Sequence, residues 1–593
     1  MVAFANAPRA RNALTATALS LFALTAAQDN ITEPLSTFYT RPDLTPPALN
    51  CSIQEDGLAP GYIFIAPYGA TQSAPYIYDK SCNLIWSGYG FAGPETSHDV
   101  QVCTYNGEDH LCFMQGNQMK GYARGHGLIL DKSYSIIKSV EVGGSGIPSV
   151  DMHEFNVIDN GKSALVTAYM TIPYDLADFG ITTGVGYIQD GTFQEIEIET
   201  GKMLFEWRAI DHVPLNASYV LPNSSDTSGT GLSPSTAWDW FHINSVDKSS
   251  YSNTYLISAR SVSSLYNINS TDGSIIWTLS AGGPYTDFAC TNFNFSYQHD
   301  ARFVSENATH TLLSLYDNAS NGFNTTSPAS SSMLIALDHT THQATLLSRI
   351  TAPTQSGGIL SSSQGNTQRL PNGNIFNGWG NVDALSEHKA DGTPILYATW
   401  GAYPVMNYRA WSFNWTAAPK TLPAVYAFAK NNTDSARTAL FVSWNGATEV
   451  KSWRFLGGDD KGSVGTVLGE TEKAGFETGF MADGFSAWVA VEALDEGGNV
   501  LAKSKALRTF VPNALYADSC DEVGCPEATG YADAGGATYP VDVGGNEEVV
   551  WATGLTLFGA GRLVHSIRVH IYGLGCFRPV KGYYDILFFY KYC

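Results

Sequence analysis

Three histidines of this chain have neighbours that suit chemistry. Each lies in an aromatic, strand-like stretch with polar residues beside it: His153, His242 and His299. An imidazole can act as nucleophile, acid or base near neutral pH. For any one of them, a hydrogen-bonded core histidine is the ordinary alternative. If the three strands line one channel, the imidazoles meet in one polar site.

Arg260 lies in an otherwise uncharged strand-like stretch, residues 256–266. A guanidinium in such surroundings is costly unless it is paired. Two interpretations stay open: a buried ion pair with Asp239 or Asp300, or a fork that binds a tetrahedral oxyanion. Asn244 and the stretch 364–374, which contains Thr367, add neutral hydrogen-bonding groups. We expect no metal ligand set, because the histidines lack short-range ligand spacing and Arg260 would repel a cation.

The elements that must position these residues repeat along the chain. An alternating strand, a turn with Asp or Gly, and a second apolar strand recur at residues 76–86, 129–137, 196–205, 265–277, 334–347 and 384–397. Each predicts a hairpin. Their spacing of roughly 50–70 residues suits a four-stranded blade with loops. We therefore predict an all-β chain with a six-bladed β-propeller over residues 28–419; a series of unrelated β-sandwiches is the alternative.

The pattern changes after the predicted propeller. Residues 420–515 contain short alternating strands separated by turn signals, which predicts an immunoglobulin- or fibronectin-like β-sandwich. Residues 516–593 predict an irregular or disordered tail. Beyond Trp551 its basic residues interrupt every apolar run, so a membrane-spanning helix is not expected. Translated non-coding sequence is an alternative origin for that end.

Several features predict export. Residues 1–27 have the order of a signal peptide: Arg9 and Arg11, an apolar run, then small residues. N-x-Ser/Thr sequons begin at Asn30, Asn50, Asn216, Asn223, Asn269, Asn294, Asn307, Asn318, Asn324, Asn414 and Asn431. Cysteine spacing suggests the disulfides Cys51–Cys82, Cys103–Cys112 and Cys520–Cys525, and a buried, inert Cys290. We expect a secreted, extracellular glycoprotein.

The balance of charges limits the partners. The formal net charge is -22 at pH 7, which argues against nucleic acid and anionic membrane surfaces as partners because like charges repel. A locally positive pocket can still bind a small anion. The sequence gives no prediction of oligomeric state.

Taken in order, the motifs around His153, His242, Arg260, His299 and residues 364–374 resemble the arylsulfotransferase family, most closely its secreted fungal branch. The resemblance covers the predicted propeller and sandwich. It implies an aryl sulfotransferase that moves a sulfuryl group from a phenolic sulfate ester to a phenolic acceptor, without the nucleotide sulfate donor and without a cofactor.

The resemblance also implies roles. His299 matches the histidine that is transiently sulfurylated, His242 and Asn244 match a His-x-Asn pair, and Arg260 matches the arginine that binds sulfate oxygens. His153 matches another active-site histidine. Thr367 is the weakest substrate-binding match, and Asn366 could take its place.

Four other functions remain to be weighed. The first is a non-catalytic secreted propeller glycoprotein with a binding role. A zinc or copper enzyme is disfavoured by the histidine spacing. A quinoprotein dehydrogenase is ranked last, because the sequence has no adjacent cysteine pair and no convincing calcium loop. A P-loop sulfotransferase lacks its strand, glycine-rich loop and helix.

Overall fold

The computed structural model describes residues 33–527, except 91–94, 145, 226–227, 281–284 and 402–403. The predicted signal peptide and most of the predicted tail lie outside these residues. The described chain is all-β: it consists of strands and single 3-10 turns, and this part contains no α-helix. The turns are η1 (Asp159–Gly161), η2 (Ala177–Phe179), η3 (Ala209–Asp211), η4 (Leu215–Ala217), η5 (Pro234–Thr236), η6 (Thr354–Ser356) and η7 (Ala517–Ser519).

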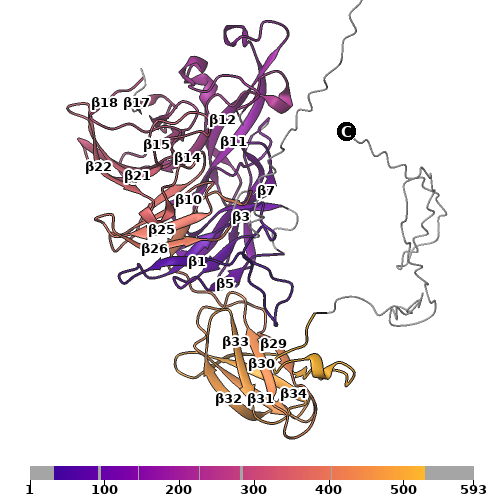
Figure 1. Ribbon diagram of the computed structural model, residues 1–593. Coiled ribbons are helices and arrows are strands. Elements are labelled where there is room, and N and C mark those ends of the chain that lie inside the picture. The colour runs from indigo at the N-terminus through magenta and orange to yellow at the C-terminus, as the bar shows by residue number, and fades with distance from the viewer. Residues whose placement is uncertain are drawn as a thin grey trace, which may run out of the picture. The chain divides into compact units, whose positions relative to one another are not determined.

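Strands between residues 50 and 413 form six sheets of four or five strands in the described chain (Figure 1). The first contains β28 (Trp411–Phe413), β2 (Tyr62–Ile65), β4 (Tyr76–Tyr78) and β5 (Leu84–Ser87). The second contains β6 (Thr96–Tyr105), β7 (Glu108–Gln118), β8 (Ala123–Leu130) and β9 (Ile136–Val140). The third contains β10 (Phe155–Ile158), β11 (Ser163–Tyr174), β12 (Gly186–Glu197) and β13 (Met203–Arg208).

The remaining three sheets follow the same plan. The fourth contains β14 (Ile243–Lys248), β15 (Tyr255–Ala259), β16 (Ser264–Ile268) and β17 (Ile275–Leu279). The fifth contains β18 (Ala289–Cys290), β22 (Gln343–Thr351), β21 (Ser331–Asp338), β20 (His310–Asp317) and β19 (His299–Glu306). The sixth contains β1 (Asn50–Gln54), β26 (Pro394–Thr399), β25 (Ala384–His388), β24 (Ile375–Gly378) and β23 (Asn366–Arg369). A short pair joins β3 (Pro67–Tyr68) to β27 (Met406–Asn407).

All six hairpins expected from the sequence are formed. Buried apolar clusters fill the space between each sheet and the next. A further cluster, with Ile63 and Tyr76 from the first sheet and Phe376 and Leu396 from the sixth, joins the last sheet to the first. Late strand β28 pairs with early strand β2, and early strand β1 pairs with late strand β26. The two ends of this region are therefore interleaved.

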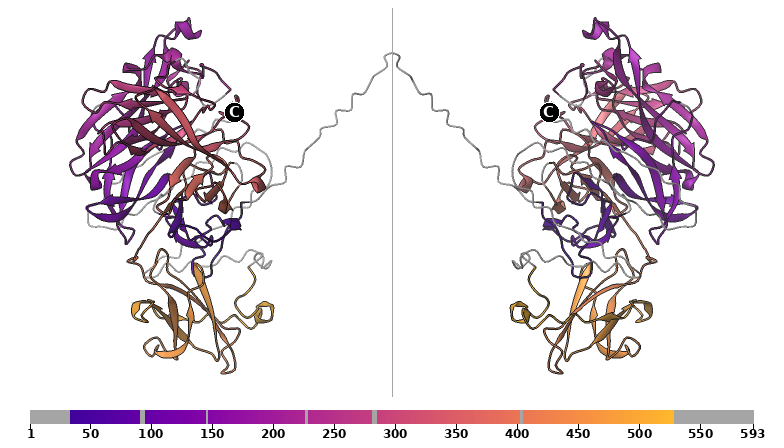
Figure 2. Two further views of the ribbon diagram at one scale, coloured as in Figure 1. Left: turned by 90° about the vertical axis from the view of Figure 1, so that its left-hand side faces the viewer. Right: turned by 90° about the vertical axis from the view of Figure 1, so that its right-hand side faces the viewer.

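Residues 424–508 form a second group of strands, orange to yellow in Figure 1 and again distinct in the side views of Figure 2. One sheet contains β29 (Ala424–Phe428), β30 (Thr438–Ser443) and β33 (Glu477–Ala482). The other contains β32 (Thr466–Glu472), β31 (Ser452–Gly458), β34 (Trp488–Leu494), β35 (Val500–Lys503) and β36 (Leu507–Arg508). Side chains of both sheets, including Leu440, Phe455 and Val491, share one buried cluster.

Cysteine pairing follows the sequence prediction. The disulfides Cys51–Cys82, Cys103–Cys112 and Cys520–Cys525 are present. Cys290 has no disulfide partner among the described residues. It is half-buried rather than fully buried, and this burial raises the pKa of its thiol to about 11, which makes it a poor nucleophile.

Candidate functional site

The three histidines selected from the sequence lie together. The ring centres of His153 and His242 are 4.7 Å apart, and those of His242 and His299 are 6.4 Å apart. Each residue comes at or just before an edge strand of its own sheet: β10, β14 and β19 respectively. All three are buried. Strand starts from three different sheets thus build one cluster of imidazoles, here called the histidine cluster.

Irregular backbone at these strand starts directs the side chains. His242 adopts a left-handed φ of 56°, which is unusual for a residue with a side chain. The pairing register shifts between Ile243 and Ser245 and between His299 and Arg302, as in β-bulges. Bulges re-aim side chains next to functional sites. Such local strain persists only where surrounding contacts enforce it.

Each Nδ1 atom of the histidine cluster has its own partner. Nδ1 of His153 lies 2.6 Å from Oδ2 of Asp151, and Nδ1 of His242 is hydrogen-bonded to Oδ2 of Asp239. Nδ1 of His299 lies 2.6 Å from Oδ1 of Asn318. Two imidazoles are therefore paired with carboxylates and the third with a neutral amide.

Burial controls ionisation in the cluster. It holds the pKa of His242 and of His299 well below the usual range, and the positive charge of Arg260 lowers both further. Burial raises the pKa of Asp239 to about 7, against the lowering effects of His153 and Arg260. At Asp151, burial also favours the neutral acid, but the charge of His153 and its hydrogen bond outweigh it, so the pKa lies below normal.

Arg260 borders the cluster at the end of β15. Its backbone N–H donates to the carbonyl oxygen of His242 at 2.9 Å. Its Nη2 donates to the carbonyl oxygen of Ser362 at 3.0 Å, and its guanidinium lies 5.8 Å from the ring centre of Tyr297. Of the two acids considered as ion-pair partners, Asp300 pairs with other arginines and Asp239 with His242.

Asn244 lies in β14, two residues after His242. Its Nδ2 donates to the carbonyl oxygen of Gln298 at 2.7 Å, so the amide ties β14 to the residue before His299. Its own carbonyl oxygen accepts from Tyr408 and Arg409, both at 2.9 Å. These contacts give Asn244 a part in holding the strands that carry two of the histidines.

Thr367 makes its hydrogen bonds with residues outside the histidine cluster. Its backbone N–H donates to Oδ2 of Asp300 at 3.0 Å, and its hydroxyl donates to Oδ1 of Asn377 at 3.2 Å. Thr367 lines a cavity of about 370 Å³ that Glu154 and Arg302 also line. The alternative, Asn366, uses its amide to bind both backbone groups of Ala410. Nothing in these contacts brings either residue to the histidine cluster.

The segment Ser361–Gln364 covers His299 and is called here the covering segment. The backbone N–H of Gln364 donates to Nε2 of His299 at 3.2 Å. Nδ2 of Asn318 donates to the carbonyl oxygen of Gln364 at 3.0 Å. His299 is only 1% exposed, against 7% for His242 and 8% for Arg260. The cluster is therefore nearly closed to solvent in this conformation.

A second polar layer, which the sequence patterns do not predict, surrounds the fully buried Arg409. Its Nη1 lies 2.7 Å from Asp99 and 3.2 Å from Glu154. Its Nη2 donates to the carbonyl oxygens of His153 and Asn244, both at 2.9 Å. Arg302 pairs with Glu154 and Asp300 at 2.8 Å. This charged layer supports the backbone that carries the histidine cluster.

His98 was also missed. Its fully buried ring packs edge-on against Tyr68 at 4.8 Å, and its Nε2 is hydrogen-bonded to the hydroxyl of Thr96 at 2.9 Å. Burial lowers its pKa to about 3, and His153 lowers it further, although Asp151 opposes the shift. A sequence signal existed: a histidine followed by an acid occurs at His98–Asp99, His153–Glu154 and His299–Asp300.

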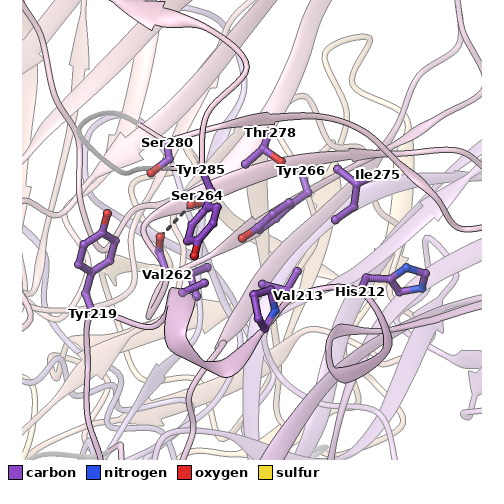
Figure 3. Close-up of a pocket in the computed structure, with 12 residues that line it drawn as sticks. His212, Val213, Tyr219, Val262, Ser264, Tyr266, Ile275, Thr278, Ser280 and Tyr285 are labelled. Atoms are coloured by element: carbon purple, nitrogen blue, oxygen red, sulfur yellow. Dashed lines mark hydrogen bonds between the residues drawn. The ribbon is translucent and has the colours of Figure 1, made fainter.

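A separate pocket of about 160 Å³ lies beside the β16–β17 hairpin (Figure 3). The rings of Tyr219, Tyr266 and Tyr285 and the side chain of Val262 line it. It adjoins the turn that follows Arg260. Ser280 and Tyr285 at its rim flank residues 281–284, which are not described.

Across the described residues, no group of three or more histidine, cysteine or acidic side chains has the arrangement of a metal site. In the same part of the chain, no helix has the length and apolarity that a membrane crossing requires.

Comparison with known proteins identifies one family. A family model described as "Arylsulfotransferase (ASST)" matches residues 101–401. That range spans half of the chain and includes all three residues of the histidine cluster and Arg260. No curated protein matches.

Solved structures are only distantly similar. A protein of unknown function from Bacteroides caccae has a TM-score of 0.34 and 10% identity, covering 59% of this chain and 98% of its own. TolB from Acinetobacter baumannii has a TM-score of 0.30 and 12% identity, covering 59% and 67%. Hydrazine synthase of Kuenenia stuttgartiensis has a TM-score of 0.29 and 12% identity, covering 58% and 77%. Likeness at this level supports no conclusion on fold or function.

Proposed function

The chain belongs to the arylsulfotransferase family, and on that premise we propose that it transfers a sulfuryl group from a phenolic sulfate ester to a phenolic acceptor through His299. One observation carries the proposal: imidazoles from three sheets meet beside the guanidinium of Arg260. A sulfuryl group needs a nucleophile, a proton donor and a cation for its oxygens. The histidine cluster and Arg260 together contain all three kinds of group.

In the proposed reaction, the Nε2 lone pair of His299 attacks sulfur as the bond from sulfur to the aryl oxygen breaks. The leaving phenolate takes the Nε2 proton of His242, while Nδ1 of His242 takes up the proton of Asp239. The acceptor phenol then gives its proton to Nε2 of His242, which returns the Nδ1 proton to Asp239. The phenol oxygen attacks sulfur, which breaks the N–S bond and frees His299. The covalent intermediate divides the reaction into two half-reactions, and the proton transfer of the second reverses that of the first. Ping-pong kinetics are therefore expected. No nucleotide donor takes part.

Arg260 is the proposed binder of the sulfuryl oxygens. Its Nη2 now donates to a backbone carbonyl oxygen in the covering segment, at Ser362. Since Nε2 of His299 also accepts an N–H from that segment, substrate entry requires the covering segment to move. In the proposed complex, the sulfuryl oxygens replace the Ser362 carbonyl on Arg260, and sulfur replaces the Gln364 N–H at Nε2.

The test is to trap the intermediate. Protein incubated with an aryl sulfate in the absence of acceptor is digested and analysed by mass spectrometry. We expect one sulfuryl group on His299 and none in His299→Ala, with turnover of that variant reduced at least about 1,000-fold. His310→Ala, at an exposed position of β20, is the matched control and keeps the label. Turning-over wild-type protein without label on His299 would reject the nucleophile.

A non-catalytic binding glycoprotein is the alternative, and the contact between the Gln364 N–H and Nε2 favours it because it occupies the proposed nucleophile. Release of a chromogenic phenol from its sulfate ester, accelerated by an added phenolic acceptor, separates the two functions. A binding protein gives no release above the buffer rate.

We also propose the architecture of the two groups of strands. Six sheets, the interleaved ends and the cluster that joins the last sheet to the first support a closed six-bladed β-propeller over residues 28–419. Two facing sheets support an immunoglobulin- or fibronectin-like sandwich over residues 420–515. Secretion through residues 1–27, glycosylation and membership of the fungal branch rest on the sequence patterns.

A further inference from the structure

The partner of Nδ1 distinguishes His299 from the other two members of the histidine cluster. His153 and His242 each face a carboxylate, whereas His299 faces the amide of Asn318. We propose that Asn318 is a positioning residue that holds His299 as a neutral nucleophile, with its proton on Nδ1 and its lone pair on Nε2. This inference rests on the proposed function of His299.

The hydrogen bonds around Asn318 fix the direction of its amide. Its Nδ2 lies near three oxygen acceptors: the carbonyl and hydroxyl oxygens of Ser361, at 3.3 and 3.4 Å, and the carbonyl oxygen of Gln364, at 3.0 Å. A flipped amide would place its oxygen against all three. Oδ1 therefore faces His299 and accepts the Nδ1–H at 2.6 Å.

The other contacts of the ring agree with this tautomer. Nδ1 also faces the carbonyl oxygen of Tyr297 at 3.1 Å, which can only accept. Nε2 lies 3.2 Å from the backbone N–H of Gln364, which can only donate. Both nitrogens thus require the proton on Nδ1. Asn318 contributes the shorter of the two contacts at Nδ1 and also anchors the covering segment.

A neutral partner suits a nucleophile better than a carboxylate does. A carboxylate on Nδ1 would favour the imidazolium, which has no lone pair on Nε2. It would also stabilise the positive ring formed when the N–S bond is made, and so slow the step that breaks that bond. The charged and titratable groups around His299 are Arg260, His242, His153 and Tyr408. Burial and the charge of Arg260 lower the pKa of His299 and outweigh the hydrogen bond to Asn318, which raises it. The amide of Asn318 adds no negative charge that would raise this pKa further.

Asn318 also begins a sequon, Asn318-Ala-Ser320, one of the predicted glycosylation sites. Its side chain is fully buried and hydrogen-bonded on both sides. No glycan can be attached to that nitrogen in this fold. The other described sequon asparagines are at least partly exposed: Asn50, Asn216, Asn223, Asn269, Asn294, Asn307, Asn324, Asn414 and Asn431.

Asn318→Asp is the informative variant, because it keeps the size of the side chain and adds a negative charge. Protonated His299 cannot attack, so the rate falls below the pKa of the ring. We expect the acid limb of the kcat profile to move to higher pH by about one unit or more. Asn318→Ala should lower kcat about 10-fold without that shift, since Tyr297 still holds Nδ1. An acid limb of folded Asn318→Asp at the wild-type position would overturn the inference.

Ser320→Ala is the matched control. It destroys the sequon but keeps Asn318, and it removes only a hydroxyl that accepts the N–H of Gly322. We expect the wild-type pH profile. A shift equal to that of Asn318→Asp would assign the effect to a lost glycan and overturn the inference.

Two measurements on wild-type protein need neither turnover nor a folded Asn318 variant. Nitrogen-15 NMR should show the proton on Nδ1 of His299. The signals of this ring are assigned by their absence from the spectrum of His299→Ala. Peptide mapping should find Asn318 without a glycan. A proton on Nε2, or a glycan on Asn318, would overturn the inference. Failure to trap sulfuryl on His299 would instead reject the proposed function while leaving the tautomer result intact.

Discussion

At the residue scale, the partner of Nδ1 decides what each imidazole can do. His242 is neutral because burial opposes its charge, and Asp239 next to it has a pKa of about 7 for the same reason. When Asp239 is protonated, it donates to Nδ1 and leaves Nε2 of His242 carrying a proton. When Asp239 is ionised, it accepts the Nδ1–H and leaves a lone pair on Nε2. One carboxyl group therefore switches His242 between acid and base.

A prediction on pH follows from that pair. The donor half-reaction needs the acid form, so its kcat/KM should fall as pH rises through about 7. Asp239→Asn cannot ionise. We expect its turnover to drop about 100- to 10,000-fold and the limb near pH 7 to vanish. Stopped-flow release of phenol between pH 5 and 9 measures both.

Asp211→Asn, which changes an exposed acid in η3, is the control and should keep the wild-type limb. If the limb persists in Asp239→Asn, another group titrates there and Asp239 is not the switch.

Residue type alone identified part of this site. His153, His242, His299 and Arg260 stood out because polar groups in apolar strands need partners, and the structure gives each of them one. Arg409 meets the same criterion in the stretch 408–413, but it is not among the residues predicted from the sequence. The role of Asn318 could not be predicted from the sequence. A sequon is a local pattern, whereas the burial of the Asn318 side chain depends on strands far away in the chain.

At the element scale, hairpins were predictable and the covering segment was not. Alternation within about ten residues is a local property, and all six hairpins formed. The covering segment is placed by contacts with Asn318 and Arg260, which are more than 40 residues away. The same holds for Thr367, because its motif match does not determine which distant residues its side chain contacts.

The disulfides give a prediction at this scale. Cys51–Cys82 joins β1 of the sixth sheet to the β4–β5 turn of the first and spans 31 residues, whereas Cys103–Cys112 spans nine within one hairpin. A longer closed loop restricts the unfolded chain more. Replacing both cysteines of the first pair with serine should cost about 4 kcal/mol, roughly 1 kcal/mol more than for the second.

Thermal midpoints of the two double variants, compared under oxidising conditions, test this order. A larger drop in thermal midpoint for Cys103→Ser/Cys112→Ser than for Cys51→Ser/Cys82→Ser would contradict the prediction. It would show that the length of the closed loop does not determine which disulfide stabilises the fold more.

At the scale of the whole molecule, Arg409 connects most of the sheets. It lies just before β28 of the first sheet and contacts Asp99 in the second, Glu154 beside the third, Asn244 in the fourth and Asp300 in the fifth. Hairpin patterns define each sheet but not which residues of different sheets meet. The contacts that Arg409 makes with several sheets are therefore visible only in the structure.

Replacing Arg409 with methionine should leave buried carboxylates without their cation, at a cost of about 3–5 kcal/mol in the free energy of unfolding at pH 8. The loss should be smaller at pH 5. Burial already raises the pKa of Asp99 to about 6 although Arg409 lowers it, so removing Arg409 raises it further. A carboxyl whose folded pKa exceeds its unfolded value contributes stability at low pH and loses it as pH rises through the folded pKa.

Denaturant unfolding of Arg409→Met at pH 5 and pH 8 measures that difference. Arg454→Met is the matched control, because Arg454 pairs with Glu470 and Glu492 while 30% exposed, and such surface pairs contribute less than about 1 kcal/mol. An equal loss for Arg409→Met at both pH values would show that the buried acids do not take up protons when their cation is gone. A loss as small as that of Arg454→Met would show that the charged layer does not depend on Arg409.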